Sequence, residues 1–206
     1  MNKDHGILLR SIPYSDSARI LHCFTENNGL LALFTRLGKR RMAGHLQAGS
    51  LIEFTAKDKS GADLLTLIDS RWDPGIPTDS LGGEEAALWL FAVELLQRSL
   101  KERLILPQLY HRMATYYGYL SQAEIAMNPI VPLVVISSQL GLSDVAMVFC
   151  LADAESLEAL QLLGVGRDQE IKASTPQTKE AFNIELERFQ QHFGIDHLGS
   201  LDLITL

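Results

Sequence analysis

The hydrophobic pattern of this sequence changes period once, around Trp72–Ser80. Before that segment, apolar residues alternate with polar ones in short runs, which predicts strands, whereas afterwards they recur every three or four positions, which predicts helices. The junction contains Pro74-Gly75 and Pro77, residues typical of a boundary. We therefore expect a mixed α+β protein of 206 residues with a strand-rich domain over residues 1–75 and an all-helical domain over residues 76–206.

The first domain is expected to hold five short strands bounded by turn residues. Their expected ranges are residues 6–12, 18–25, 30–36, 50–57 and 64–69. Asn28-Gly29 predicts a hairpin with a two-residue turn, because such turns need positive φ at both central positions. In the second strand, Ile20, His22 and Phe24 share one face. This pattern indicates a small barrel or sandwich.

The second domain begins with the most regular helix of the chain, expected over residues 84–104. Acidic residues at its start suit the helix dipole, and an apolar stripe follows. Further helices are expected to begin at Pro107 and Pro176 and to cover residues 132–140, 144–152 and 156–163. For residues 132–140, a buried strand is the alternative.

The composition is that of a soluble globular protein, with 47% apolar and 21% charged residues. No apolar run approaches the ~20 residues that a membrane span needs, and the N-terminus lacks the apolar block of a signal peptide. Cys23 and Cys150 lie far apart in apolar contexts, so we expect two buried thiols in a cytoplasmic protein. We find no motif of a metalloprotease, serine hydrolase or nucleotide-binding loop, and expect no enzyme, catalytic residue, cofactor or metal site.

Positive charge is concentrated near the N-terminus of an acidic chain, whose net charge is -7. Residues 1–75 carry ten Lys or Arg and eight Asp or Glu, which gives a net charge of +2. Residues 76–206 carry eight Lys or Arg and seventeen Asp or Glu, which gives a net charge of -9. Four cations stand within six positions without an acid: Arg36, Lys39, Arg40 and Arg41. Arginine and lysine side chains bind phosphate, so this loop is a candidate nucleic-acid contact, and a merely solvated loop is the alternative.

Two further arginines, Arg10 and Arg19, lie near strand ends and are expected to support the loop in binding phosphate. Four aromatic residues lie on or beside the expected strands: Tyr14, Phe24, Phe34 and Phe54. Packing in the core is the expectation for each, and stacking on unpaired bases is the alternative for one or two of them.

Five stretches stand in a characteristic order: Gly6–Leu21, Asn28–Leu31, the basic Gly38–Arg41, Leu46–Glu53 and the closing His197–Ile204. In this order they resemble the bacterial DNA-repair family RecO. The resemblance implies an oligonucleotide-binding (OB) barrel followed by a helical domain. It also implies binding of single- and double-stranded DNA, strand annealing, and loading of recombinase together with RecR and single-strand-binding protein.

Many members of that family carry a four-cysteine zinc module in the helical part, whereas this chain has only Cys150 there. The family's helical domain is also expected to receive the acidic, phenylalanine-ended tail of single-strand-binding protein, which needs cations beside an apolar pocket. We nominate the corner around Pro107 that carries Lys101, Arg103 and Arg112, with Leu104, Leu106, Leu109 and Tyr116 nearby. The competing hypothesis for the whole chain is an acidic protein-interaction scaffold that does not bind DNA.

The basic loop yields a quantitative prediction. Each phosphate contact contributes about one unit to the slope of log affinity against log salt concentration. Replacing Lys39, Arg40 and Arg41 together with alanine should therefore flatten this slope by about three, while folding survives because exposed cations contribute little to stability. Fluorescence anisotropy with a labelled single strand measures the slope, and a folded triple variant with the wild-type slope would show that the loop is only solvated.

Overall fold

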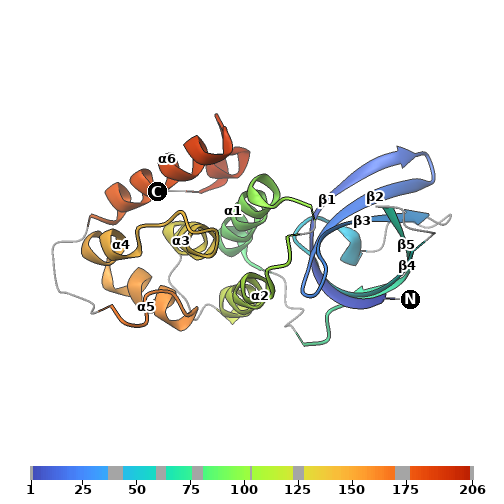
Figure 1. Cartoon of the computed structure of the whole chain (residues 1–206), viewed down its shortest axis with the longest axis horizontal. Helices are drawn as coiled ribbons and strands as arrows, with labels where there is room; N and C mark the ends of the chain where they lie inside the picture. Colours follow the sequence, from blue (N-terminus) through green and yellow to red (C-terminus); the bar gives the residue numbers. More distant parts are fainter. Residues whose placement is uncertain are drawn as a thin grey trace. The chain divides into compact units, whose positions relative to one another are not determined.

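The computed structural model describes residues 2–36, 44–58, 64–75, 81–102, 104–122, 128–169 and 177–204. Contacts divide the chain into two compact units. The first contains Met1–Thr78 and Leu100–Ala114, and the second contains Asp79–Ser99 and Thr115–Leu206. The expected order, with a five-stranded barrel first and helices second, is confirmed (Figure 1). The first unit also takes in Leu100–Ala114, which the sequence pattern assigned to the helical part.

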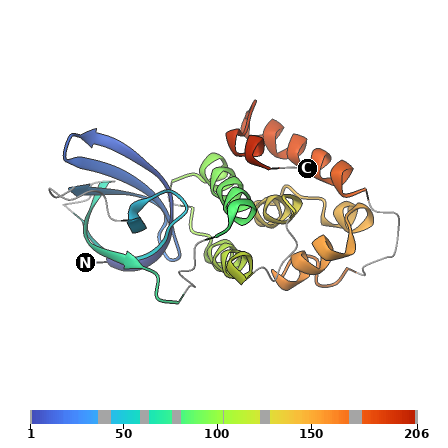
Figure 2. The ribbon, with the colours of Figure 1, turned by 180° about the vertical axis from the view of Figure 1, so that it is seen from behind.

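Five strands close into the barrel of the first unit (Figures 1 and 2). They are β1 (Asn2–Ser15), β2 (Ala18–Thr25), β3 (Gly29–Arg36), β4 (Leu51–Lys57) and β5 (Leu64–Trp72), with the short 3-10 helix η1 (Gly44–Leu46) between β3 and β4. Their order around the barrel is β1-β2-β3-β5-β4. Every neighbouring pair is antiparallel except β3 and β5, which are parallel.

The barrel interior is filled by alternate residues of the strands, as the period of two requires. The buried cluster includes Leu8, Leu21, Cys23, Leu33, Ile52 and Phe54. β1 is longer than expected because its first half pairs with β4 and its second half with β2. A register shift between Leu8 and Arg10 accompanies this change of partner, and such bulges bend a strand.

The β2–β3 hairpin differs from the expectation of a two-residue turn at Asn28-Gly29. Thr25 pairs with Gly29, so three residues form the turn, and Gly29 adopts φ of 69°. A three-residue turn followed by a left-handed residue is a standard hairpin geometry that suits glycine. The Thr25 hydroxyl donates to the Gly29 carbonyl at 2.8 Å and accepts from the backbone N–H of Asn28 at 3.1 Å.

A buried carboxylate on β1 fixes this turn. Asp4 is 1% exposed, and the side-chain amides of Asn27 and Asn28 donate to its two oxygens at 2.9 and 2.6 Å. The backbone N–H of His5 donates to the same carboxylate at 2.8 Å. Because the three-residue turn presents both asparagine side chains to Asp4, these hydrogen bonds favour it over the two-residue alternative.

The helices of the second unit surround one apolar helix. They are α1 (Gly83–Ser99), the end of α2 (Pro107–Gln122), α3 (Ile130–Gln139), α4 (Val145–Leu151), α5 (Ala154–Leu162), α6 (Thr178–Phe193) and the 3-10 helix η2 (Gly199–Leu203). All residues of α3 from Ile130 to Ser137 are buried, and α3 packs against α1, α5 and α6 (Figures 1 and 2). An apolar helix of this kind belongs in a core. None of the helices within the described ranges is long and apolar enough to cross a membrane.

Two expectations about the helical part were wrong. The first helix ends at Ser99 and not near residue 104, because Leu100–Ala114 leave the helical unit and belong to the barrel unit. Cys23 is buried, and burial raises the pKa of its thiol, but Cys150 is exposed. In the short α4, Val148 and Phe149 are the buried residues, and Cys150 comes next on the helix and faces away from them.

The Asp4 hydrogen bonds lead to a stability prediction. Asp4→Ala should lower the free energy of unfolding of the barrel by about 3 kcal/mol, because it leaves buried amide donors without acceptors. Urea unfolding followed by Trp72 fluorescence in a Trp89→Phe background reports on the barrel. Asp16→Ala is the matched control, since Asp16 is an exposed turn residue. Equal midpoints for the two alanine variants would contradict a structural role for Asp4.

Candidate nucleic-acid interface

The outside of the barrel carries a row of apolar side chains across three strands. Strand pairing places Ile12 beside Ile20 and Ile20 beside Phe34, on the face opposite to the core residue Leu21. Phe34 in turn pairs with Thr66 of β5. We call the surface over this row the outer face. Its apolar residues are only partly covered, and Ile12 is 38% exposed.

An aromatic pair stands on the outer face. Tyr14 lies at the second register shift of β1 and presents its ring edge-on to Phe34, with centroids 5.6 Å apart and an angle of 89°. Tyr14 is 64% exposed, and Phe34 is half-buried. Edge-to-face packing is a favoured aromatic geometry, so each ring limits the motion of the other. Exposed aromatic rings on a barrel face are the groups on which unpaired bases stack.

The same face is covered at its other end. Phe24 follows Ile20 on the outer side of β2, but it is fully buried because the ring of Tyr110 packs edge-on against it at 6.2 Å. The His111 Nε2 lies 3.2 Å from a carboxylate oxygen of Glu26, and both residues belong to the barrel unit. Among the described residues, the outer face is therefore covered at the Phe24 end and accessible at the end that carries Tyr14 and Phe34.

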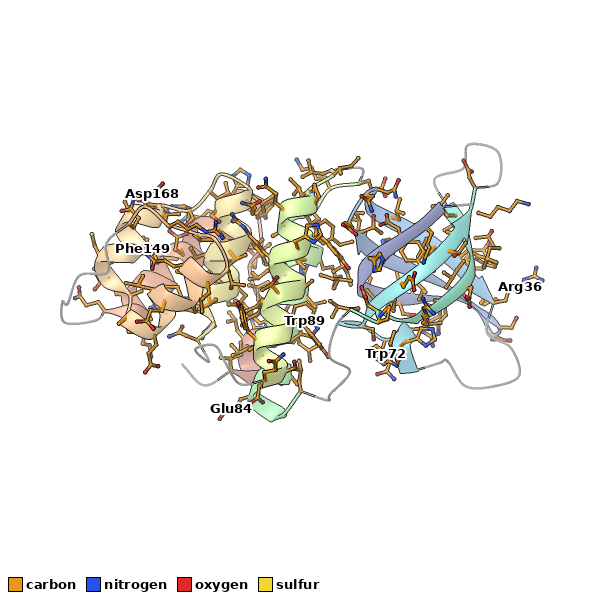
Figure 3. All side chains as sticks on the ribbon, turned by 90° about the horizontal axis from the view of Figure 1, so that it is seen from below. Arg36, Trp72, Glu84, Trp89, Phe149 and Asp168 are labelled. Atoms are coloured by element: carbon orange, nitrogen blue, oxygen red, sulfur yellow. The ribbon has the colours of Figure 1, made fainter. Side chains whose placement is uncertain are left out.

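Two of the nominated arginines lie on the outer face. Arg10 pairs with His22 and is exposed, and Arg36 is exposed at the end of β3, where Figure 3 shows its side chain extending away from the barrel. Burial and the nearby Arg10 lower the pKa of His22, against a smaller opposing effect of Glu102. Arg10 and Arg36 thus offer positive charge at two places on the open surface.

Arg19 is placed differently from the other two. It lies on the opposite side of β2 from Ile20, and its guanidinium donates to the Ser11 hydroxyl at 3.4 Å. Its Nε is buried and has no hydrogen-bond partner among the described residues. The other nominated cations of this region, Lys39, Arg40 and Arg41, lie outside the described residues.

Two other cations of the barrel are already paired. Glu53, which is nearly buried, forms ion pairs with Lys3 and Arg71, and the Arg71 Nε donates to it at 2.6 Å. Hydrogen bonds from Lys3 and Arg71 hold the pKa of Glu53 below its usual range. Because one carboxylate serves both cations, this side of the barrel offers less net charge to a polyanion than the outer face does.

The nominated partner corner is partly accessible. Lys101 is exposed, Arg112 is half-buried, and Arg103 lies outside the described residues. The apolar residues expected to line the corner divide into two groups. Leu109 and Tyr116 are fully buried and unavailable to a peptide, whereas Leu106 is half-buried and Leu104 is 41% exposed. Ile105, which was not nominated, is 55% exposed.

The fold defines the class of the first unit. A closed five-stranded barrel in the order β1-β2-β3-β5-β4, with a long β1 shared between two neighbours, is an OB-fold, as expected. In this class the β2–β3 face binds oligonucleotides or oligosaccharides. Among the described residues, no three His, Cys, Asp or Glu side chains gather as metal ligands would.

The comparison with known proteins agrees with the resemblance. Residues 1–72 match the family described as Recombination protein O N terminal, so the barrel is similar to the N-terminal part of that family. The chain is 33% identical over 129 residues to the DNA repair protein RecO of Ruegeria sp. (strain TM1040), covering 60% of this chain and 52% of that protein. It is 27% identical over 123 residues to the RecO of Anaeromyxobacter dehalogenans (strain 2CP-C), covering 57% and 48%. The RecO of Polynucleobacter necessarius is 32% identical over 122 residues, covering 58% and 48%.

The chain thus spans about half the length of the curated relatives it matches. The expected resemblance to RecO is confirmed.

Proposed function

We propose that this chain is a non-catalytic DNA-binding recombination mediator of DNA repair, which binds and anneals single strands and helps to load recombinase. The observation that carries the proposal is the open outer face, where Tyr14 and Phe34 stand between Arg10 and Arg36. This face is the one that OB-folds use for oligonucleotides. Aromatic rings for bases and cations for phosphates are the two components of single-strand binding sites.

The charge distribution supports an electrostatic mechanism for this binding. In residues 6–25, Arg10 and Arg19 are opposed by a single acid, Asp16, and β3 contains no acid. Affinity that comes mostly from phosphate contacts falls steeply as salt rises, because binding releases counterions from the nucleic acid. The matched relatives are DNA repair proteins, which favours DNA as the nucleic acid.

Anisotropy titrations of a labelled single strand over a series of salt concentrations test this proposal. The wild type should bind with a steep slope, and Arg10→Ala and Arg36→Ala should each flatten the slope by about one unit. Arg98→Ala is the control, since Arg98 lies on α1 and is 3.6 Å from Glu94 in an ion pair. Binding that does not respond to salt, or an effect of Arg98→Ala equal to that of Arg36→Ala, would overturn the mechanism.

The acidic scaffold is the second candidate, and the charge of -9 over residues 76–206 favours it. The two candidates differ in the behaviour of the purified chain on immobilised DNA. A mediator is retained and elutes with salt, whereas a scaffold passes through the resin.

We also propose RecR and single-strand-binding protein as partners, on the basis of the resemblance. Lys101, with the exposed Leu104 and Ile105 close by in sequence, offers a cation beside apolar surface for an acidic, phenylalanine-ended tail.

Calorimetric titration of that tail peptide should show weaker binding to Lys101→Ala and to Arg112→Ala than to the wild type. Lys179→Ala serves as the control, because Lys179 is an exposed cation on α6. Unchanged affinity in both corner variants would remove this site, without bearing on DNA binding by the barrel.

A further inference from the structure

A groove opens beside the aromatic pair because β3 and β5 pair over a short distance only. Their parallel ladder covers Ala32–Phe34 and Leu64–Thr66 and then stops. Beyond this point the strands separate, and a groove of about 570 Å³ lies between them, within the range of ligand-sized pockets. It is lined by the end of β3, the middle of β5 and η1: Phe34, Thr35, Arg36, His45, Leu46 and residues 66–70.

We propose that this groove receives an unpaired base of the bound strand. The inference rests on the proposed function and deepens it, because it assigns the groove to the base and the rim to the phosphate. If the groove binds an unpaired base, this part of the barrel binds single strands and not duplexes.

The aromatic wall of the groove provides the stacking surface. Phe34 lines the groove and is also the ring against which Tyr14 packs. One ring therefore belongs both to the outer face and to the groove, so a strand that crosses the outer face can place a base against Phe34. Ile68, which is 51% exposed at the same groove, adds apolar surface for the base.

Polar groups in the groove suit the edge of a base. The His45 Nε2 and the Ser70 hydroxyl are 2.8 Å apart, and Thr66 and Asp69 contribute a hydroxyl and a carboxylate. Burial lowers the pKa of His45 against smaller opposing effects of Asp69 and Ser70, which favours a neutral ring with one donor and one acceptor.

The distribution of charge favours a base inside the groove and a phosphate at its rim. Arg36 lines the groove with its exposed side chain, whereas Asp69 contributes a carboxylate to the lining. A phosphate would be repelled by Asp69 but attracted by Arg36. A nucleotide whose base lies against Phe34 and whose phosphate reaches Arg36 satisfies both groups. Paired bases in a duplex are already stacked and cannot enter, so a duplex would retain only the phosphate contact.

The test compares one labelled single strand with the duplex formed from it, using the full chain. Phe34→Leu keeps an apolar side chain but removes the ring, and it should weaken single-strand binding by at least about fivefold while leaving duplex binding and the salt slope unchanged. Thr66→Trp, which fills the groove beside Phe34, should act in the same direction. Phe193→Leu is the control, since Phe193 is a half-buried phenylalanine of α6. Circular dichroism confirms that each variant is folded.

The outcomes separate this inference from the proposed function. If Arg36→Ala weakens binding but both Phe34→Leu and Thr66→Trp bind single strands like the wild type, DNA binding stands and the groove assignment is wrong. An equal loss for single strand and duplex in both groove variants also overturns the assignment. If the wild type binds neither DNA form, the proposed function fails and the groove assignment fails with it.

Discussion

The short parallel ladder between β3 and β5 is the contact on which the rest of the first unit depends. Without it, the other four strand pairings would form an open, strongly curved sheet with two unpaired edges. The ladder closes the barrel at Ala32–Phe34 and Leu64–Thr66, and this closure shields the interior cluster around Leu33 from water. Because it ends at the Phe34–Thr66 pair, it also leaves the groove between the end of β3 and the middle of β5. Closure and binding surface are thus two results of the same short contact.

The outer face shows how packing from a distant segment selects among equivalent positions. Phe24 and Phe34 both point outward, and Asn28-Gly29 lies between them in sequence, yet only Phe34 is available to a ligand. The ring of Tyr110 covers Phe24 and so confines the exposed aromatic surface to one half of the β2–β3 hairpin. Tyr14, held in place at an irregularity of β1, completes that half. The accessible surface therefore depends on the covering of Phe24 by Tyr110 as well as on the exposure of Tyr14.

Much of this organisation is predictable from the sequence, and the remainder depends on long-range contacts. Alternation correctly placed Ile20 and Phe24 on one face of β2, because side-chain direction is a local property of a strand. It did not show that Phe24 would be covered while Phe34 stays half-buried, since the coverage of Phe24 depends on Tyr110, far away in the chain. The length of β1 and the end of α1 were missed for the same reason, because each is set by pairing or packing with a distant partner. Neither His45 nor Asp69 belonged to a sequence motif, and the ladder that creates their groove has no local signal.

The path of the chain through Leu100–Ala114 has a consequence for how the molecule can be divided. The polypeptide leaves the barrel unit after Thr78, builds α1 in the helical unit, returns to the barrel, and then departs again through α2. The units are therefore tied together by three passages of the chain and not by one tether. A fragment that stops at residue 75 would lack Tyr110 and His111, leaving Phe24 exposed to water and Glu26 without its contact to the His111 ring. In this chain, the point where the sequence pattern changes and the point where the molecule can be cut are different places.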